Sequence, residues 1–386
     1  MSVSVNSRRA RLRSALAVVL TVLVLLPAAA LFLRVLDDNT EQRDRLMLEN
    51  QGVEYLMALS PLVSALAESQ SSALQGVSAE PASLTAAVAR VQDADARLGE
   101  ALDTSERWAG LKEKIGRLPN ATGDAASIYE AHVEVSDLTL ALYSAVRENS
   151  TLNRDEESDV WFLQQAAAVD MPEAVTAVSR MGDTANLVAA AKAKQRAPLN
   201  IRFGYEVLAV QDAGDELTDN LQAAVEDTES ATLAGNLVSN LNSFKRGIED
   251  ANRGANFGGT PNVSAMVTAQ STLQTALNAL SGVVLKEMKT LLDDRIDALN
   301  YRRAEAWGLL AVAVALIVVA TFWTRARARQ VTDSIDDAPS RDVSVQGDAG
   351  ANPYSGPNPY DQAPNYGEIP NYGDNATRRE RSGALR

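Results

Sequence analysis

Apolar residues recur at three- and four-residue steps through most of the chain, and this spacing predicts amphipathic α-helices. The clearest series are Leu48, Tyr55, Leu59, Leu62 and Leu66 near the start, and Leu273, Leu277, Leu280, Val284, Met288, Leu291, Ile296 and Leu299 near the end. Sustained alternation of apolar and polar residues, which is typical of strands, does not occur between positions 36 and 305. The pattern therefore predicts an all-α domain of antiparallel helix bundles.

Turn-forming residues divide this domain into long helices. Gly- and Pro-rich breaks stand at Gly76–Pro81, Pro119–Gly123 and Arg253–Asn262. The expected helices are 36–76, 82–118, 124–152, 156–196, 198–228, 229–253 and 263–305, with a break near Pro172, a kink at Pro61 and Pro198 in a first turn. We expect two bundles stacked in tandem that share the first and the last helix.

An uncharged run of seventeen residues, Trp307–Trp323, predicts a membrane-spanning helix. Its terminal tryptophans suit the two membrane interfaces, and a cluster of arginines follows at once (Arg325, Arg327 and Arg329). Basic residues favour the cytoplasmic side, so the C-terminal side of this helix is expected to face the cytoplasm.

A second apolar run covers residues 15–33, after a basic leader at 1–14. We interpret it as a retained anchor; a cleaved signal peptide is the alternative, because Ala28–Ala30 offers small residues for cleavage. With two spans, residues 34–306 form an extracytoplasmic domain, and both termini lie in the cytoplasm. The expected location is the inner, or plasma, membrane of a bacterium.

Residues 324–386 are rich in Pro, Gly, Asn and Ser and predict a disordered cytoplasmic tail. Four tyrosines recur every six residues within it, at Tyr354, Tyr360, Tyr366 and Tyr372. This period fits extended, polyproline-like chain. The tyrosines are candidate contacts for a cytoplasmic protein partner, and an inert tether is the alternative.

Composition narrows the chemistry. The chain has no Cys and a single His, which argues against disulfides, thiolate sites and histidine-based catalysis, so we expect no enzyme and no cofactor or metal. Positions 36–305 hold 41 acidic and 23 basic side chains, a net charge of −18 that disfavours nucleic acid as a partner.

Three groups of charged or titratable residues could sense pH, bind calcium or form salt bridges. His132 is expected as a partly exposed helix residue, with a pH-sensing contact as the alternative. The acids at 155–159 suit a helix start rather than calcium. Arg43 and Arg45 lie at a depth comparable to Glu287, Asp294 and Asp297, so salt bridges between the first and last helices are expected to set their alignment.

The order span, long helices, span is similar to bacterial two-span receptors with four-helix-bundle sensory domains. Residues 62–74 (LVSALAESQSSAL), Trp108–Leu118 and Tyr129–Leu152 carry a local likeness to nitrate/nitrite-sensing domains, and the shared long helices resemble helical bimodular sensors. Ser69 follows Glu68, so the resemblance implies no nitrate-coordinating Arg there. The 63 residues after Trp323 leave no room for a kinase or chemoreceptor output domain.

These observations support two hypotheses. The first is a membrane-anchored, receptor-like sensory protein that binds a small molecule in its external bundle and signals through a partner recruited by its tail. The second is a non-catalytic scaffold of the cell envelope. In either case we expect a homodimer formed through the long helices.

Overall fold

The computed structural model describes residues 3–77, 79–152, 158–227, 231–256 and 260–336. The chain separates into two units, Met1–Val318 and Val319–Arg386, and the described part of the second unit is the end of one helix. Every regular element among the described residues is helical, so the expected all-α class is confirmed.

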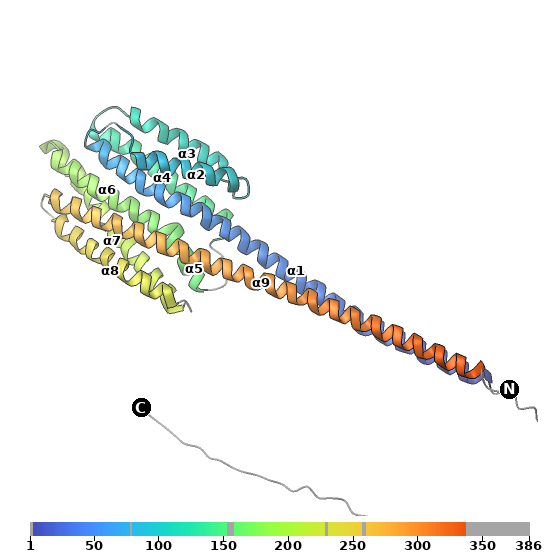
Figure 1. Cartoon of the computed structure of the whole chain (residues 1–386). Helices are drawn as coiled ribbons and strands as arrows, with labels where there is room; N and C mark the ends of the chain where they lie inside the picture. Colours follow the sequence, from blue (N-terminus) through green and yellow to red (C-terminus); the bar gives the residue numbers. More distant parts are fainter. Residues whose placement is uncertain (1–2, 78, 153–157, 228–230, 257–259, 337–386) are drawn as a thin grey trace, which may run out of the picture. The chain divides into compact units, whose positions relative to one another are not determined.

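Two very long helices, α1 (Val3–Leu74) and α9 (Val263–Asp336), begin and end the order of elements (Figure 1). Between them come α2 (Ala82–Leu98), α3 (Ser105–Arg117), the 3-10 turn η1 (Leu118–Asn120), α4 (Ala125–Asn149), α5 (Ser158–Gln165), the π-helical turn η2 (Ala166–Asp170), α6 (Met171–Ala190), α7 (Ala193–Asp227) and α8 (Ala231–Ala255).

The apolar stripes of the sequence form the core of the first unit. Tyr55, Leu59 and Leu62 on α1 have no exposed surface, and the same is true of Leu277 and Leu280 on α9. Full burial of a leucine side chain contributes about 1.5–3 kcal/mol. The helices are therefore held together mainly by these stripes, as their spacing predicted.

Helices α1 and α9 run antiparallel in a nearly constant register. Phe32 stacks edge-on against Trp307 with ring centroids 5.7 Å apart, and Arg43 Nε donates to Asn300 Oδ1 at 3.0 Å. Farther along α1, Asn50 Nδ2 donates to the carboxylate of Asp293, at 2.7 Å. Each step forward on α1 is matched by a similar step back on α9, so the two helices form one continuous pair.

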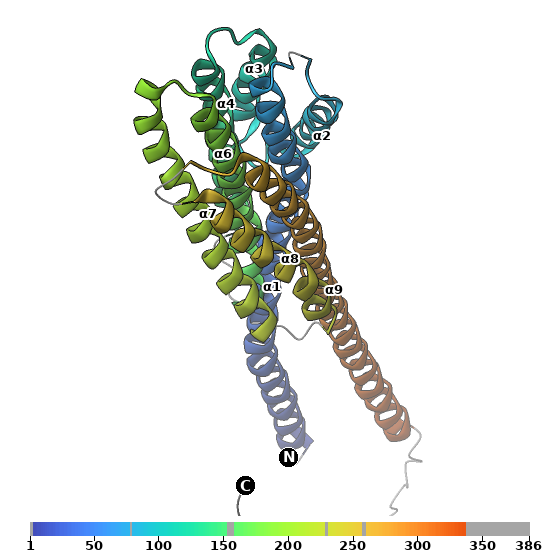
Figure 2. The ribbon, with the colours of Figure 1, turned by 90° about the vertical axis from the view of Figure 1, so that its left-hand side faces the viewer.

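The remaining helices lie beside this pair in two groups (Figures 1 and 2). One group, α2 to α4, packs with α1, and the other, α5 to α8, packs with α9. Gln70 of α1 contacts Asp183 of α6, and Gln270 of α9 lies against Gly182 of α6, so all three helices share one level. The expectation of two bundles stacked along shared helices was therefore wrong: the two groups stand side by side.

The predicted helix 82–118 is in fact two helices, because the chain turns back between Leu98 and Ser105. Asp95 organises the turn: its carboxylate accepts hydrogen bonds from Thr104 Oγ1 and from Tyr55 of α1, both at 2.9 Å. Asp103 adopts a left-handed φ of 49°. A tertiary contact from α1 thus fixes a break that lacks a Pro and that local propensity did not show.

The expected break at Pro172 is instead a widened turn. Pro172 has no N–H to donate and its ring crowds the preceding turn. The π-helical turn η2 directly precedes α6 and lets the helical path continue from α5. The helix then ends at Ala190 rather than 196, and α7 begins at Ala193, which places Pro198 beyond its first turn.

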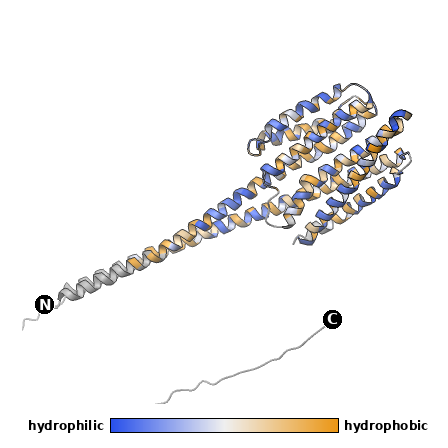
Figure 3. Ribbon diagram, turned by 180° about the vertical axis from the view of Figure 1, so that it is seen from behind, coloured by the Kyte–Doolittle hydropathy of each residue, from blue (hydrophilic) through white to orange (hydrophobic). Residues whose placement is uncertain are grey.

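One helix among the described residues, Val263–Trp323 of α9, is long and apolar enough to cross a membrane. Apolar side chains in its final run, 307–323, are exposed, with Leu309 66% and Leu316 64% exposed. Both long helices turn from hydrophilic to hydrophobic away from the bundle (Figure 3). Eight of the nineteen side chains of the other expected span, 15–33, lie outside the described residues, and its described members Leu26 and Leu31 are also exposed.

Candidate functional site

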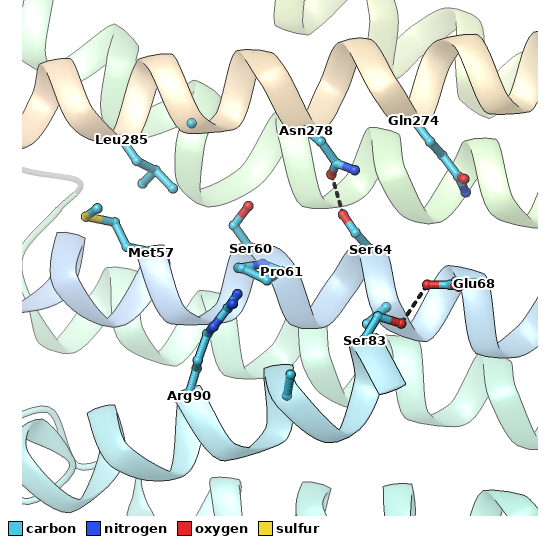
Figure 4. A pocket seen from close by; sticks show the side chains of 13 residues that line it. Met57, Ser60, Pro61, Ser64, Glu68, Ser83, Arg90, Gln274, Asn278 and Leu285 are labelled. Carbon is cyan, nitrogen blue, oxygen red and sulfur yellow. Dashed lines mark hydrogen bonds between the residues drawn. The ribbon is translucent and has the colours of Figure 1, made fainter. Parts of the chain in front are cut away.

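A groove of about 600 Å³ opens between α1, α2 and α9 (Figure 4). Each helix contributes a stripe of side chains at three- and four-residue spacing, next to its buried apolar stripe. The lining residues are Met57, Ser60, Pro61, Ser64, Ala65 and Glu68 from α1, Ser83, Ala86 and Arg90 from α2, and Gln274, Asn278, Gly282 and Leu285 from α9. Six of these thirteen residues are serine, alanine or glycine, and their small side chains leave the hollow.

Hydrogen bonds across the groove join α1 to its two neighbours. Ser64 Oγ donates to Asn278 Oδ1 of α9 at 2.5 Å, and Ser83 Oγ of α2 donates to Glu68 Oε2 at 2.6 Å. Ser60 and Ser281 share a hydrogen bond of 2.7 Å. The groove-facing side of the contact between α1 and α9 therefore consists of short polar side chains, next to the leucine stripes that both helices bury at the same level.

Several polar groups in the groove have no partner among the described residues. The Arg90 side chain reaches from α2 toward Ser60 and Pro61 and forms no ion pair with a described residue (Figure 4). The buried Gln274 Nε2 likewise has no hydrogen-bond acceptor in the described part of the chain. Pro61 cannot donate to the Met57 carbonyl, so the helix leaves that oxygen without its usual partner. The groove thus offers a cation, a donor and an acceptor to a bound molecule.

A second polar cluster is buried between α1 and α6 beside the groove level. Asp183 Oδ2 accepts from Gln70 Nε2 at 2.8 Å and from Ser179 Oγ at 3.4 Å, while Oδ1 has no partner among the described residues. Burial raises the pKa of Asp183 to about 7, and the hydrogen bonds from Gln70, Ser71 and Ser179 oppose this rise. A carboxyl group that half-ionises near neutral pH therefore lies between the two helix groups.

A charged network extends this contact to α4 and α7. The Arg202 guanidinium lies 4.5 Å from the Tyr129 ring centroid and pairs with Glu130. Arg180 of α6 pairs with Asp137 of α4 at 2.5 Å. These cation–π and ionic contacts hold α4, α6 and α7 in register, and exposure of the carboxylates limits each pair to about 1 kcal/mol.

His132 does not lie where the sequence placed it. Only 3% of the surface of His132 is exposed to solvent, whereas a partly exposed side chain was expected. Both ring nitrogens lack a partner in the described part of the chain, and the side chain lines a separate cavity of about 120 Å³. Packing of α4 against α1 buries the ring, and Leu84 of α2 lines the same cavity.

The remaining candidate residues from the sequence are Arg43 and Arg45, the acids near 155 and the tail tyrosines. Arg43 reaches α9 through Asn300, and Arg45 pairs with Glu41 at 3.5 Å on its own helix. The expected salt bridge at Arg43 was therefore wrong, because the amide of Asn300 takes the place of a carboxylate. The tail tyrosines Tyr354, Tyr360, Tyr366 and Tyr372 and the acids at 155–157 lie outside the described residues.

Sequence reasoning missed the groove itself. Its signal was present, because Ser60, Ser64 and Glu68 repeat at four-residue steps beside the leucine stripe of α1.

Comparison with protein-family models, curated proteins and solved structures finds no match for this chain. No group of three metal-binding side chains gathers within the described ranges.

Proposed function

We propose that the chain is a membrane-anchored, receptor-like sensory protein whose groove binds a small polar molecule. It is anchored in the inner membrane by residues 15–33 and 307–323, with both termini in the cytoplasm. The tail recruits a cytoplasmic partner through its repeated tyrosines. The proposal agrees with the resemblance of the sequence to bacterial two-span receptors with helical sensory domains.

The position of the groove carries this proposal. Two of its three walls, α1 and α9, are the helices that continue toward the two proposed spans. A molecule bound between Ser64 and Asn278 would contact both helices at once. Any change in their separation or register would reach the membrane along continuous helices, without a hinge in between.

The groove-facing side of the α1–α9 contact suits such a change because it consists of short polar side chains. Exchanging hydrogen bonds among Ser60, Ser64, Ser281 and Asn278 requires less repacking than moving interlocked leucines. A ligand shifts the two helices only by its difference in affinity for their arrangements. A hundredfold preference supplies about 2.7 kcal/mol, which is enough to invert a modest equilibrium.

The lining also indicates the class of ligand. Hydroxyl and amide groups give and accept hydrogen bonds, while Arg90 and Glu68 provide one charge of each sign. Such a surface complements a small molecule that carries both donors and acceptors, such as an amino acid or a hydroxy acid.

The test is a thermal-unfolding screen of the full chain in lipid nanodiscs against amino acids, carboxylates and amines. A ligand should raise the melting temperature of the wild type, and Ser64→Leu, which fills the groove, should abolish the rise. Ser144→Leu adds the same bulk on the exposed face of α4 and should keep it. A rise that persists in Ser64→Leu would contradict a site in this groove.

A second candidate function, an envelope scaffold, is favoured by a different surface. Ile201, Tyr205 and Leu208 form one exposed stripe on α7, with exposures of 64%, 69% and 49%. Exposed apolar stripes of this kind mark protein contacts. If no compound changes the melting temperature and an envelope protein co-purifies in a fixed ratio that Tyr205→Ser abolishes, the scaffold is the better account.

A further inference from the structure

A second cavity, of about 120 Å³, lies at the end of the bundle away from the spans and does not belong to the groove. It is bounded by the end of α1, the start of α2, η1 and α4. The lining relevant here is Ser69, Ala73, Leu84, Leu118, Ile128 and His132. A water molecule occupies about 30 Å³ in the liquid, so the cavity has room for a molecule of several heavy atoms.

His132 gives this cavity a specific chemistry. The imidazole is buried, yet neither Nδ1 nor Nε2 has a hydrogen-bond partner among the residues that the structure describes. Buried polar side-chain atoms nearly always have a partner, in the protein or in a bound molecule. Two unpaired nitrogens at the wall of a hollow therefore point to an occupant that pairs with at least one of them.

The charge state of the ring narrows the class of occupant. Burial lowers the pKa of His132 to about 4, so the imidazole is neutral near pH 7 and offers one donor and one acceptor. Most of the surrounding wall is apolar, and the Ser69 hydroxyl adds a second donor and acceptor. The one charged lining residue in the described part of the cavity, Glu80, is exposed to solvent.

We propose that this cavity binds a small uncharged molecule with a branched or short apolar body and a hydrogen-bonding head, such as a primary amide or an alcohol. The head pairs with His132, and the body packs against Ala73, Leu84 and Ile128. An ion of the same size would lose its hydration without gaining a buried counter-charge. The site is independent of the proposed groove ligand.

The chain's single histidine makes the test direct. Full-length protein in detergent, labelled with ¹³C and ¹⁵N only in histidine, gives one imidazole signal at position 132. Titration with isobutyramide or 2-methylpropan-1-ol should shift this signal saturably. Isobutyrate and isobutylammonium, which match these probes in shape but carry charge, should leave it unchanged.

A filled cavity provides the control. Ala73→Leu occupies the space and should abolish the saturable shift, whereas Ala109→Leu, on the exposed face of α3, should keep it. If Ala73→Leu fails to fold by circular dichroism, Ala121→Leu fills the cavity from another wall. A folded wild type that shows no saturable shift with either neutral probe, or a filled variant that shifts like the wild type, would overturn the proposal.

Discussion

Replacing Asp183 with Asn should stabilise the protein at alkaline pH, although it alters a fully buried, hydrogen-bonded residue. Burial raises the pKa of this carboxyl from 3.8 to about 7. Between these values the folded chain binds more protons than the unfolded chain, so the stability contributed by Asp183 falls as pH rises from about 4 to about 7. Above pH 7 the folded protein holds a buried carboxylate whose Oδ1 has no partner among the described residues.

The size of the effect follows from the shift in pKa. About three units correspond to about 4 kcal/mol, and this is an upper limit because the unfolded chain also retains some structure. The substituted asparagine cannot ionise, and its side-chain oxygen can still accept from Gln70. We therefore expect Asp183→Asn to exceed the wild type in unfolding free energy by up to about 4 kcal/mol at pH 8, and to match it at pH 4.

Urea unfolding of the full chain in nanodiscs, followed by circular dichroism at pH 4, 6 and 8, measures this difference. Asp215→Asn, on the exposed face of α7, is the matched control and should show a small, nearly constant difference. The reasoning fails if Asp183→Asn destabilises the protein equally at every pH, because Asp183 would then act only through its hydrogen bonds.

Three further predictions concern other contacts. Gly52→Ala should destabilise the bundle by about 1–3 kcal/mol in urea unfolding, because the added Cβ would collide with the Ser150 side chain at the end of α4; Gly110→Ala, with open space around it, should instead stabilise by about 0.5–1 kcal/mol. The pair Ser60→Cys and Ser281→Cys should form a disulfide on mild oxidation, visible as a mobility change on a non-reducing gel, because the two hydroxyls are 2.7 Å apart and the native chain has no cysteine; absence of the bond would contradict the α1–α9 register. Burial lowers the pKa of His132 from 6.5 to about 4, so His132 costs stability as pH falls through this window, and His132→Phe should resist acid unfolding better by up to about 3 kcal/mol at pH 4; equal acid sensitivity of the two proteins would refute this.

The sequence predicted the helices well where an apolar stripe forms them. Leu59 and Leu62 repeat at helical spacing and are fully buried, as are Leu277 and Leu280. Local spacing was enough there, because each stripe identifies its own buried face.

The sequence did not reveal features that depend on a distant partner. The turn after Leu98 depends on Asp95 binding Tyr55, forty residues earlier. The placement of two helix groups side by side rests on contacts between distant segments, such as Gln70 with Asp183. The groove needs three helices to leave small residues facing one another, and no single segment shows this.

The antiparallel pairing of α1 with α9 has a consequence for how the chain is made. The first helix is complete at Leu74, yet its partner begins only at Val263, so the ribosome must synthesise the intervening helices before the pair can close. Throughout that time one side of α1 lacks its cover. Ser60 and Ser64 on that side tolerate water, and this keeps a nascent chain less prone to aggregate than a leucine surface would.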